Sequence, residues 1–190
     1  MIRASDLTKS YGPRAALAHV SFDVAAGSVT AVIGANGAGK STLLRCLAGL
    51  IAHGGTATVE RPIGYLPQGA ALPPGATVRE VRSLFAQLGG RRAVGTTGLD
   101  DRPAATLSGG QHQRAALAAL FALAPRTLLL DEPTANLDDG ARAELIATLH
   151  DLARDGVTIM LTSPASDAGE LAHAFDGVLT LADGRLVSIT

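Results

Sequence analysis

A glycine-rich segment between an apolar strand and a helix is the feature that most constrains this chain. The segment reads GANGAGKST and occupies residues 34–42. It follows a β-branched, apolar run at residues 28–33, and it precedes a run with Leu43, Leu44 and Leu47 at helical spacing. Its glycines allow successive backbone N–H groups to point into one concave cradle, and the following helix adds about half a positive charge at its N-terminus. The segment therefore predicts a phosphate-binding loop.

The residue types within this segment indicate how a nucleotide would be held. Lys40 would reach the β and γ phosphates as a point charge. The Ser41 hydroxyl would ligate Mg²⁺, and Thr42 would support the loop. The alternative, a glycine-rich turn that contains GKS by chance, is expected in roughly one chain in a hundred of this size. The predicted nucleotide-binding residues of this segment are Gly34, Asn36, Gly37, Gly39, Lys40, Ser41 and Thr42.

A second apolar strand ends in two carboxylates. Residues 128–130 are leucines, and Asp131 and Glu132 follow directly. A parallel sheet would present this strand end beside the phosphate-binding loop. Adjacent strand residues point to opposite sides, so only one carboxylate can face a metal closely. Asp131 suits a Mg²⁺ contact, and Glu132 suits a base that orients or deprotonates the attacking water. Taken alone, the pair could instead be a strand end that meets solvent.

Apolar strands and helices alternate along the rest of the chain. This alternation predicts a parallel sheet covered on both faces. Residues 89–102 are polar and glycine-rich, and they are expected to form a loop. The expected strands are residues 2–6, 20–24, 28–33, a pair between 54 and 67, 127–131, 157–162, 178–181 and 185–189, and the expected helices are residues 40–49, 77–88, 110–123 and 139–154.

Composition bounds the class of protein. At 190 residues with 47% hydrophobic residues, the chain has the length and apolar content of one domain with a sizeable core. Lys and Arg number 16 against 17 Asp and Glu, so no global attraction to nucleic acid is expected. Cys46 is the only cysteine in the sequence, which rules out an internal disulfide and fits a reducing cytoplasm.

Membrane insertion is not expected either. The most apolar run, residues 115–124, is far shorter than the roughly 20 residues that a spanning helix needs. The N-terminal residues do not have the pattern of a signal peptide. We therefore expect that the chain does not cross a membrane by itself.

The segment LSGGQ at residues 107–111 indicates the family that the chain resembles. LSGGQ is the signature of the ABC ATPase family, and it separates that family from other proteins with a phosphate-binding loop. Hydroxyl and backbone donors of this segment open a helix and would face an anion at its N-terminus. The resemblance implies that the anion is the γ-phosphate of ATP held by a second subunit, which makes Ser108, Gly109, Gly110 and Gln111 nucleotide contacts. A serine-capped helix start is the plainer alternative, and it is compatible with this function.

The resemblance extends over almost the whole chain and implies an architecture. An ABC ATPase has a P-loop NTPase fold of the α/β class, with a parallel core sheet, a small antiparallel β region and a short helical subdomain. On this basis residues 1–190 form a single ABC ATP-binding domain, in which the helical subdomain at about residues 69–124 is inserted in the phosphate-loop core. Two such subunits would meet head to tail, each phosphate-binding loop facing the other's signature, with ATP and Mg²⁺ between them.

Further segments match the family. Tyr11, in LTKSYG, resembles the aromatic residue that stacks on adenine. Gln68, in IGYLPQ, resembles the glutamine that contacts Mg²⁺ and the attacking water and relays the nucleotide state to the membrane partner. The segment ANLD at residues 135–138 resembles the loop that lies along the dimer interface. Each has a plainer alternative: a half-buried strand tyrosine, a loop glutamine, and a turn followed by a helix cap.

The sequence departs from the family after the strand expected at residues 157–162. Family members place a histidine just past this strand, where it contacts the γ-phosphate and holds the water. This chain has Ser163 and Pro164 there instead. Ser163 could donate one hydrogen bond, whereas Pro164 has neither a donor nor a titratable group. His173, further along the chain, is not expected to substitute. Loss of one positioned catalytic group costs about 10²–10⁴ in rate, so we expect normal ATP binding with slow turnover.

These observations favour an ATP-binding and ATP-hydrolysing subunit of an ABC transporter. The subunit would couple MgATP binding and hydrolysis at a head-to-tail dimer interface to transport by separate permease subunits. It would lie in the cytoplasm, peripheral on the inner face of the cell membrane through those subunits. The alternative is a low-turnover, nucleotide-gated binding or regulatory subunit, the degenerate half of an asymmetric ABC pair. Glu132, Gln68 and the signature favour the first interpretation, and the missing histidine favours the second.

An ABC protein that acts on nucleic acid or the ribosome is a weaker interpretation. Such proteins resemble tandem cassettes or cassettes interrupted by a coiled coil, and neither feature is present in this sequence. Substrate selectivity would reside in membrane or extracellular subunits. The transported substrate, the direction of transport and the choice between homodimer and heterodimer therefore stay open at this point.

Overall fold

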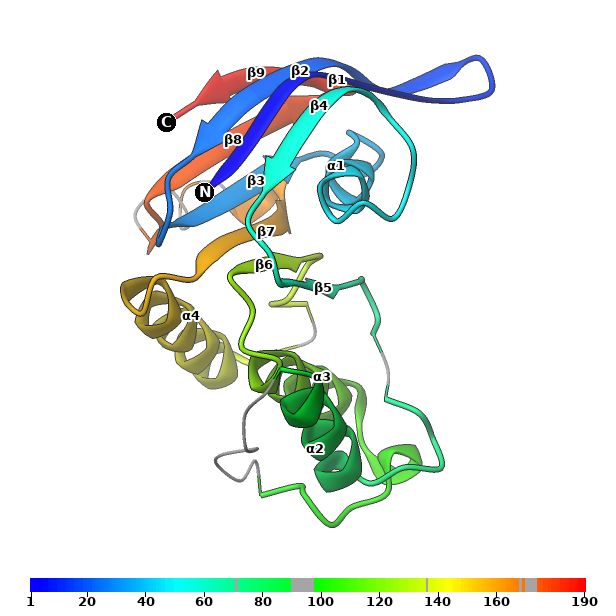
Figure 1. Cartoon of the computed structure of the whole chain (residues 1–190), viewed down its shortest axis with the longest axis vertical. Coiled ribbons are helices and arrows are strands. Elements are labelled where there is room, and N and C mark those ends of the chain that lie inside the picture. The colour runs from blue at the N-terminus through cyan, green and yellow to red at the C-terminus, as the bar shows by residue number, and fades with distance from the viewer. Residues whose placement is uncertain (71, 90–97, 136, 168, 170–173) are drawn as a thin grey trace.

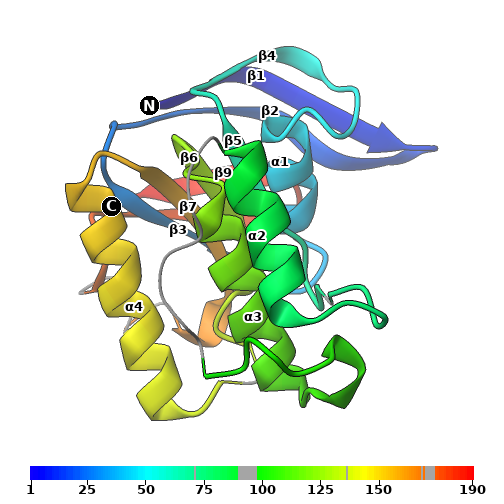
Figure 2. The ribbon, with the colours of Figure 1, turned by 60° about the horizontal axis from the view of Figure 1, so that its bottom comes forward.

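The computed structural model describes residues 1–70, 72–89, 98–135, 137–167, 169 and 174–190, and within them the chain forms two β-sheets with helices around them (Figure 1, Figure 2). The larger sheet has six strands in the order β5-β6-β7-β3-β8-β9, and the smaller sheet has three in the order β2-β1-β4. The strands are β1 (Ile2–Tyr11), β2 (Arg14–Val24), β3 (Val29–Gly34), β4 (Gly54–Val59), β5 (Ile63–Leu66), β6 (Thr127–Leu130), β7 (Thr158–Pro164), β8 (Gly177–Ala182) and β9 (Arg185–Ile189). The helices are α1 (Lys40–Leu47), α2 (Val78–Leu88), α3 (Gly109–Ala122) and α4 (Asp139–Arg154), with short 3₁₀ turns at Ala104–Thr106 and Ala165–Asp167.

The larger sheet is parallel except at its β9 edge, which confirms the parallel sheet predicted from the sequence. β3 pairs with β7 and β8, and β6 pairs with β5 and β7, all in parallel. β9 runs antiparallel to β8 and forms the expected hairpin with it. Every residue of β3 and β6 is buried, and burial on both faces is the reason for the unbroken apolar sequence of these strands.

Alternate residues of the central strands contribute to two separate hydrophobic cores. Val32 packs on the side of α1 and the smaller sheet, with Leu43 among its neighbours. Ile33 belongs to the other core, which includes Leu149 of α4 and residues of α3. Figure 1 shows the same two layers, with the smaller sheet and α1 on one side and α3 and α4 on the other. Because successive strand residues point to opposite faces, this two-sided packing fixes the register of β3 and hence the position of the loop that follows it.

The pair of short strands expected between residues 54 and 67 is present, but the two strands belong to different sheets. β4 pairs with β1 in antiparallel fashion, whereas β5 pairs with β6 in parallel. Their partners come from distant parts of the chain, so the local sequence does not specify this division. β1 and β2 also extend beyond their expected ranges and meet at a tight turn, where Tyr11 pairs with Arg14.

Helices α2 and α3 pack together at the end of the molecule away from the smaller sheet (Figure 1, Figure 2). The Thr77 side chain and Glu80 form a capping box that begins α2, and a buried ion pair of 2.6 Å joins Arg82 to Asp100. Residues 98–102 form neither helix nor strand, in agreement with the expected loop, and residues 90–97 lie outside the described residues. Among the described residues, no helix combines the length and apolar character needed to cross a bilayer.

Candidate functional site

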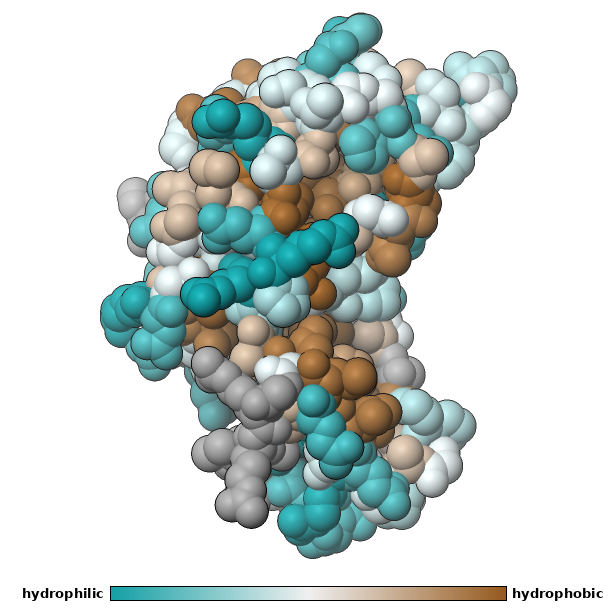
Figure 3. All heavy atoms as spheres, viewed as in Figure 1, coloured by the Kyte–Doolittle hydropathy of each residue, from teal (hydrophilic) through white to brown (hydrophobic). Residues whose placement is uncertain are grey.

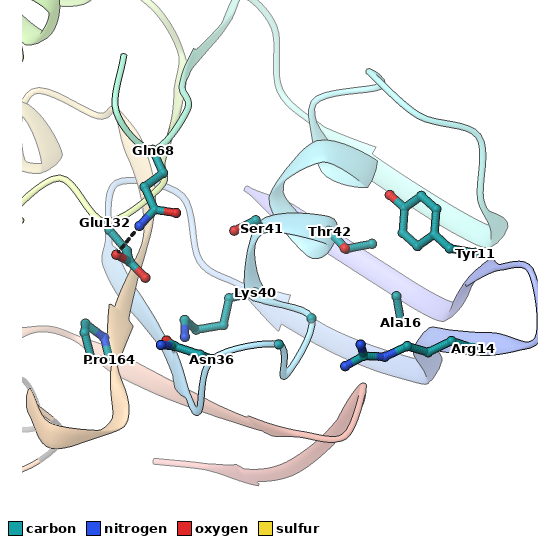
Figure 4. A pocket seen from close by; sticks show the side chains of 12 residues that line it. Tyr11, Arg14, Ala16, Asn36, Lys40, Ser41, Thr42, Gln68, Glu132 and Pro164 are labelled. Carbon is teal, nitrogen blue, oxygen red and sulfur yellow. Dashed lines mark hydrogen bonds between the residues drawn. The ribbon is translucent and has the colours of Figure 1, made fainter. Parts of the chain in front are cut away.

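A pocket of about 660 Å³ lies at the carboxyl edge of the larger sheet (Figure 4). The loop between β3 and α1, the ends of β6 and β7, the segment after β5 and the β1–β2 hairpin all contribute to it. The fold thus places the predicted residues Tyr11, Gln68 and Glu132 around the phosphate-binding loop. The residues that line the pocket are Tyr11, Arg14, Ala16, Asn36, Gly37, Gly39, Lys40, Ser41, Thr42, Gln68, Glu132 and Pro164.

The shape of the phosphate-binding loop depends on glycines with left-handed backbone conformations. Gly37 has a φ of 81° and Gly39 a φ of 107°, values that residues with a side chain rarely adopt. A Cβ at Gly39 would also overlap the carbonyl oxygen of Ala16. Gly39 is the N-cap of α1, which begins at Lys40, so the positive end of the helix dipole faces the pocket. The loop therefore has the backbone geometry of an anion cradle.

The Lys40 side chain lies inside this loop rather than in solvent. The residue is 6% exposed, and its Nζ donates to the carbonyl oxygens of Gly34 at 2.6 Å and Ala35 at 3.2 Å. A buried ammonium is stabilised here by backbone carbonyls. Its charge is consequently held within the cradle that the loop forms.

The predicted metal residues Asp131 and Ser41 lie in contact. Asp131 is 2% exposed, and its Oδ1 accepts from Ser41 Oγ at 3.1 Å and from Thr162 Oγ1 at 2.7 Å. Its Oδ2 is buried and has no hydrogen-bond partner among the described residues. A buried carboxylate oxygen without a partner is costly, and a divalent cation would satisfy it. These hard oxygen donors therefore fit Mg²⁺.

The predicted water-activating residues also lie together. Gln68 Nε2 donates to Glu132 Oε2 at 2.7 Å. Glu132 has a φ of 50°, a left-handed conformation that costs about 1–3 kcal/mol for a residue with a side chain. Its backbone N–H donates to Thr162 Oγ1 at 2.8 Å, and the Gln113 amide donates to the carbonyl oxygens of Glu132 and Pro133. These bonds hold the strained turn and aim the carboxylate at the pocket.

The predicted adenine-stacking residue Tyr11 lies at the rim of the pocket, where its ring is accessible. It is 50% exposed and lines the pocket. Lys9 Nζ lies 5.2 Å from the centroid of the Tyr11 ring and donates to the Ala52 carbonyl oxygen at 2.7 Å. The ring is thus supported by a cation that is itself bound to the chain.

The signature residues lie outside this pocket. The Ser108 hydroxyl accepts from the Gln111 backbone N–H at 3.4 Å, and the Gln111 side chain accepts from the Ser108 backbone N–H at 3.1 Å. This capping box begins α3, in agreement with the helix start expected from the sequence. Neither these residues nor Gly109 and Gly110 line the pocket, so the fold does not bring the signature to the loop of the same chain. The Asp138 side chain caps α4, while residue 136 of the ANLD segment is outside the described residues.

A family model described as ABC transporter matches residues 17–135, more than half of the chain. The chain belongs to the ABC transporter family. Similar curated proteins include the sulfate/thiosulfate import ATP-binding protein CysA of Thermosynechococcus vestitus, with 38% identity over 99% of this chain and 63% of that protein. They also include the Fe(3+) ions import ATP-binding protein FbpC of Serratia marcescens, with 36% identity over 95% of this chain and 60% of that protein. This ABC chain therefore spans less than two thirds of the length of these relatives.

Solved structures share the fold of this ABC chain. An ATP binding subunit of an ABC transporter aligns with 100% of this chain and 89% of that chain, with a TM-score of 0.87 and 25% identity. A dimeric post-hydrolysis state of the ATP-binding cassette MJ0796 aligns with 100% of this chain and 98% of that chain, with a TM-score of 0.85 and 23% identity. These matches confirm the α/β fold of the ABC ATPase type.

Ser163 donates one hydrogen bond, as expected, but Pro164 rather than Ser163 faces the pocket at the end of β7. β7 continues to Pro164, and Pro164 lines the pocket (Figure 4). Ser163 is 1% exposed, and its Oγ donates to Asp167 Oδ2 at 2.7 Å instead of facing the pocket. Burial by itself raises the pKa of Asp167, but bonds from Ser163 and Ser166 and the charge of Arg142 outweigh it and leave this pKa below its ordinary value. His173 lies outside the described residues.

No sequence pattern pointed to three residues at or around the pocket: Gln113, Thr162 and Arg14. Thr162 joins Asp131 to the Glu132 backbone, and Gln113 joins α3 to the same turn. Arg14 lines the pocket opposite Tyr11. The only local signal for Gln113 is its place shortly after LSGGQ. A threonine in a buried strand and an arginine after a turn carry no distinctive pattern of their own.

Proposed function

We propose that this chain binds MgATP in the pocket and hydrolyses it as the ATP-binding subunit of an ABC transporter. The observation that carries this proposal is that three groups of functional residues lie close together. The phosphate-binding loop, the Asp131 carboxylate with its unpartnered oxygen and the Gln68–Glu132 pair all meet at the carboxyl edge of the larger sheet. ATP hydrolysis needs an anion cradle, a metal ligand and a base, and these parts supply them.

The phosphate chain of ATP would lie in the cradle between Asn36 and Thr42. Backbone N–H groups of the loop would donate to phosphate oxygens, and Lys40 would exchange its carbonyl contacts for the β and γ phosphates. Ser41, Asp131 and Gln68 would hold Mg²⁺, which on binding supplies positive charge beside the β and γ phosphates. These roles agree with the hydrogen bond of 3.1 Å that places the Ser41 hydroxyl beside Asp131.

Glu132 and Gln68 would act on the attacking water. Their side chains bond each other at 2.7 Å and both line the pocket. The carboxylate would accept a hydrogen bond or a proton from water, and the amide would hold the same water in line with the γ-phosphate. The backbone contacts from Thr162 and Gln113 keep the carboxylate in place while this occurs.

A second ABC subunit would complete the site. Ser108, Gly109, Gly110 and Gln111 lie outside the pocket of their own chain, so they are free to face the γ-phosphate held by another subunit. A head-to-tail dimer, of identical or different subunits, would form two such sites. We assign the segment of about residues 69–124 to the helical subdomain that carries this signature into the interface.

Membrane-spanning permease subunits would dock on an apolar groove of about 500 Å³ between β5, α2 and α3. Figure 3 shows hydrophobic side chains gathered where these helices meet the larger sheet. Pro67 lines this groove, and the adjacent Gln68 lines the nucleotide pocket, so one segment connects both surfaces. Docking there would place the chain in the cytoplasm, on the inner face of the membrane. We propose import as the direction because the relatives are named import proteins, and no substrate is inferred because their named substrates differ.

Pro164 supports a second candidate function. A chain without the polarising group at this position could bind ATP and turn it over slowly, as a nucleotide-gated partner of a more active subunit. The intact Gln68–Glu132 pair and the family membership favour the hydrolysing subunit.

Steady-state MgATP hydrolysis and MgATP affinity of the purified chain test the proposed function. We expect Glu132→Gln to lower turnover by about 10²–10⁴-fold and to leave affinity for MgATP within the wild-type range, because a base is lost and the cradle is not. Glu144→Gln, the same change on the exposed side of α4, is the matched control and should leave both unchanged. Absence of MgATP binding by the wild-type chain would contradict the proposal. Turnover that Glu132→Gln does not reduce would remove Glu132 from the reaction.

A further inference from the structure

Arg14 occupies a position at the pocket that none of the family motifs covers. It begins β2 and pairs directly with Tyr11 of β1 across the turn of Gly12 and Pro13. Gly12 has a φ of 57°, which suits this tight turn. Directly opposite residues of an antiparallel pair project on the same face of the sheet. The hairpin end therefore presents an aromatic ring and a guanidinium to the same pocket, and both line it.

The Arg14 guanidinium reaches the phosphate-binding loop. A side-chain carbon placed on Gly37 would lie 3.2 Å from Arg14 Nη2. Figure 4 shows the side chain extending from the β1–β2 hairpin toward the loop, with its charged end pointing away from the hairpin. Ala16, the next residue on this face of β2, also lines the pocket, and its small side chain leaves space above the strand.

Arg14 has no hydrogen-bond or ion-pair partner within the part of the chain that the structure describes. Arg3, Arg79 and Arg154 each pair with an aspartate at 2.9 Å or less. A guanidinium is always charged and has several donors in a planar fork that matches phosphate oxygens. An unpaired guanidinium beside an anion cradle is thus ready to accept an anionic ligand.

The charges of the pocket favour the same assignment. Asp131 and Glu132 contribute two negative charges, and Lys40 contributes one positive charge that is bound to backbone carbonyls. Arg14 is the second cation among the residues that line the pocket. The phosphate chain of a nucleotide brings further negative charge to the same place, where each cation raises affinity.

We propose that Arg14 is a nucleotide-binding residue whose guanidinium contacts the phosphate chain from the open side of the loop, opposite Lys40. The proposal rests on the proposed function, because it requires that the pocket bind ATP. The guanidinium lies over Gly37 of the loop, which assigns it to the phosphates and leaves the base to Tyr11. Arg14 and Tyr11 would then clamp the two ends of the nucleotide from one hairpin.

Two probes separate a phosphate contact from a base contact: MgATP, and inorganic tripolyphosphate with Mg²⁺. We expect Arg14→Gln to weaken binding of both probes by a similar factor of about five to twenty, the range of one charge-assisted hydrogen bond at a partly exposed site. Arg14→Lys should fall between the wild type and Arg14→Gln, because it keeps the charge and loses the fork. Tyr11→Ala should weaken MgATP alone, because tripolyphosphate has no base.

Arg154→Gln is the matched control, since it removes the same charge from an exposed residue of α4 and should leave both affinities unchanged. An unchanged thermal unfolding midpoint of Arg14→Gln would show that its fold is intact. Equal binding of both probes by Arg14→Gln and the wild type would overturn the role of Arg14 and leave the proposed function standing. Weaker binding of MgATP alone would overturn the phosphate assignment. Failure of the wild type to bind either probe would overturn both proposals.

Discussion

Two sets of residues beside the phosphate-binding loop, called here the metal edge and the water edge, differ in how completely hydrogen bonds fix their side chains. The metal edge consists of Ser41, Asp131 and Thr162, which come from three separate segments and are joined by hydrogen bonds of 3.1 and 2.7 Å. The second oxygen of Asp131 has no hydrogen-bond partner among the residues that the structure describes. These hydrogen bonds hold the Asp131 carboxylate in one position, and a divalent cation would satisfy its second oxygen.

The water edge consists of Gln68, Glu132 and Pro164. Gln68 and Glu132 bond each other at 2.7 Å, but the pyrrolidine ring of Pro164 offers no donor and no titratable group. Under the proposed function, binding of MgATP would depend mainly on the metal edge, and its turnover on the water edge. Loss of one catalytic group at the water edge would then slow turnover without weakening MgATP binding, so the two properties should separate under mutation.

Asp131→Asn should have the largest effect of the three substitutions, because it removes the proposed metal ligand from the metal edge. The amide keeps the size of the side chain and removes the charge, so we expect affinity for Mg²⁺ in the presence of ATP to fall by about 100-fold or more, beyond the loss typical of an outer-shell change. Titration of ATP binding and hydrolysis with Mg²⁺ measures this effect. Asp23→Asn, an exposed aspartate remote from the pocket, is the control. An unchanged Mg²⁺ requirement would mean that Asp131 is not a metal ligand and does not belong to the metal edge.

Pro164→His should have an intermediate effect, a rise in turnover, because it changes the water edge. An imidazole at this position supplies a donor to the γ-phosphate, and we expect turnover to rise about tenfold, less than the full value of a positioned catalytic group because the surrounding contacts are not adapted to it. Measurement of kcat for MgATP hydrolysis decides the outcome, and MgATP affinity should stay the same. Pro164→Ala removes the ring without adding a donor and should not raise kcat. If both variants behave as the wild type, the proline is not what limits turnover.

Ser163→Ala should have the smallest effect, because Ser163 faces away from both edges. Its hydroxyl donates to Asp167, so its loss should cost about 1 kcal/mol of unfolding free energy and leave turnover within about twofold of the wild type. The bonds to Asp167 hold its pKa below the ordinary value, and a lowered carboxyl pKa stabilises the fold above the pKa of the unfolded chain. The difference in unfolding free energy between variant and wild type should therefore be present at neutral pH and shrink as the pH falls through the pKa of Asp167. Chemical denaturation at neutral and acidic pH measures it, and a large fall in turnover would show that Ser163 belongs to the water edge after all.

The features that the sequence predicted well are those that depend on neighbouring residues. The glycine-rich loop, the leucine run before Asp131 and the capped helix start after Leu107 each have a local cause in backbone freedom, burial or capping. The structure places all of them as expected. The assignment of β4 and β5 to different sheets could not be predicted in this way, because each strand is short and its partner lies far along the chain.

Local sequence patterns predict the phosphate cradle, the two carboxylates, the signature and the parallel sheet that carries them. Packing in the folded chain sets which of these side chains face the pocket. It turned Pro164 toward the pocket and Ser163 toward Asp167, and it set Arg14 beside Gly37 of the loop. The physical reason is that strand direction and hairpin register are fixed by packing between residues distant in sequence, and a shift of one residue would reverse each of these positions.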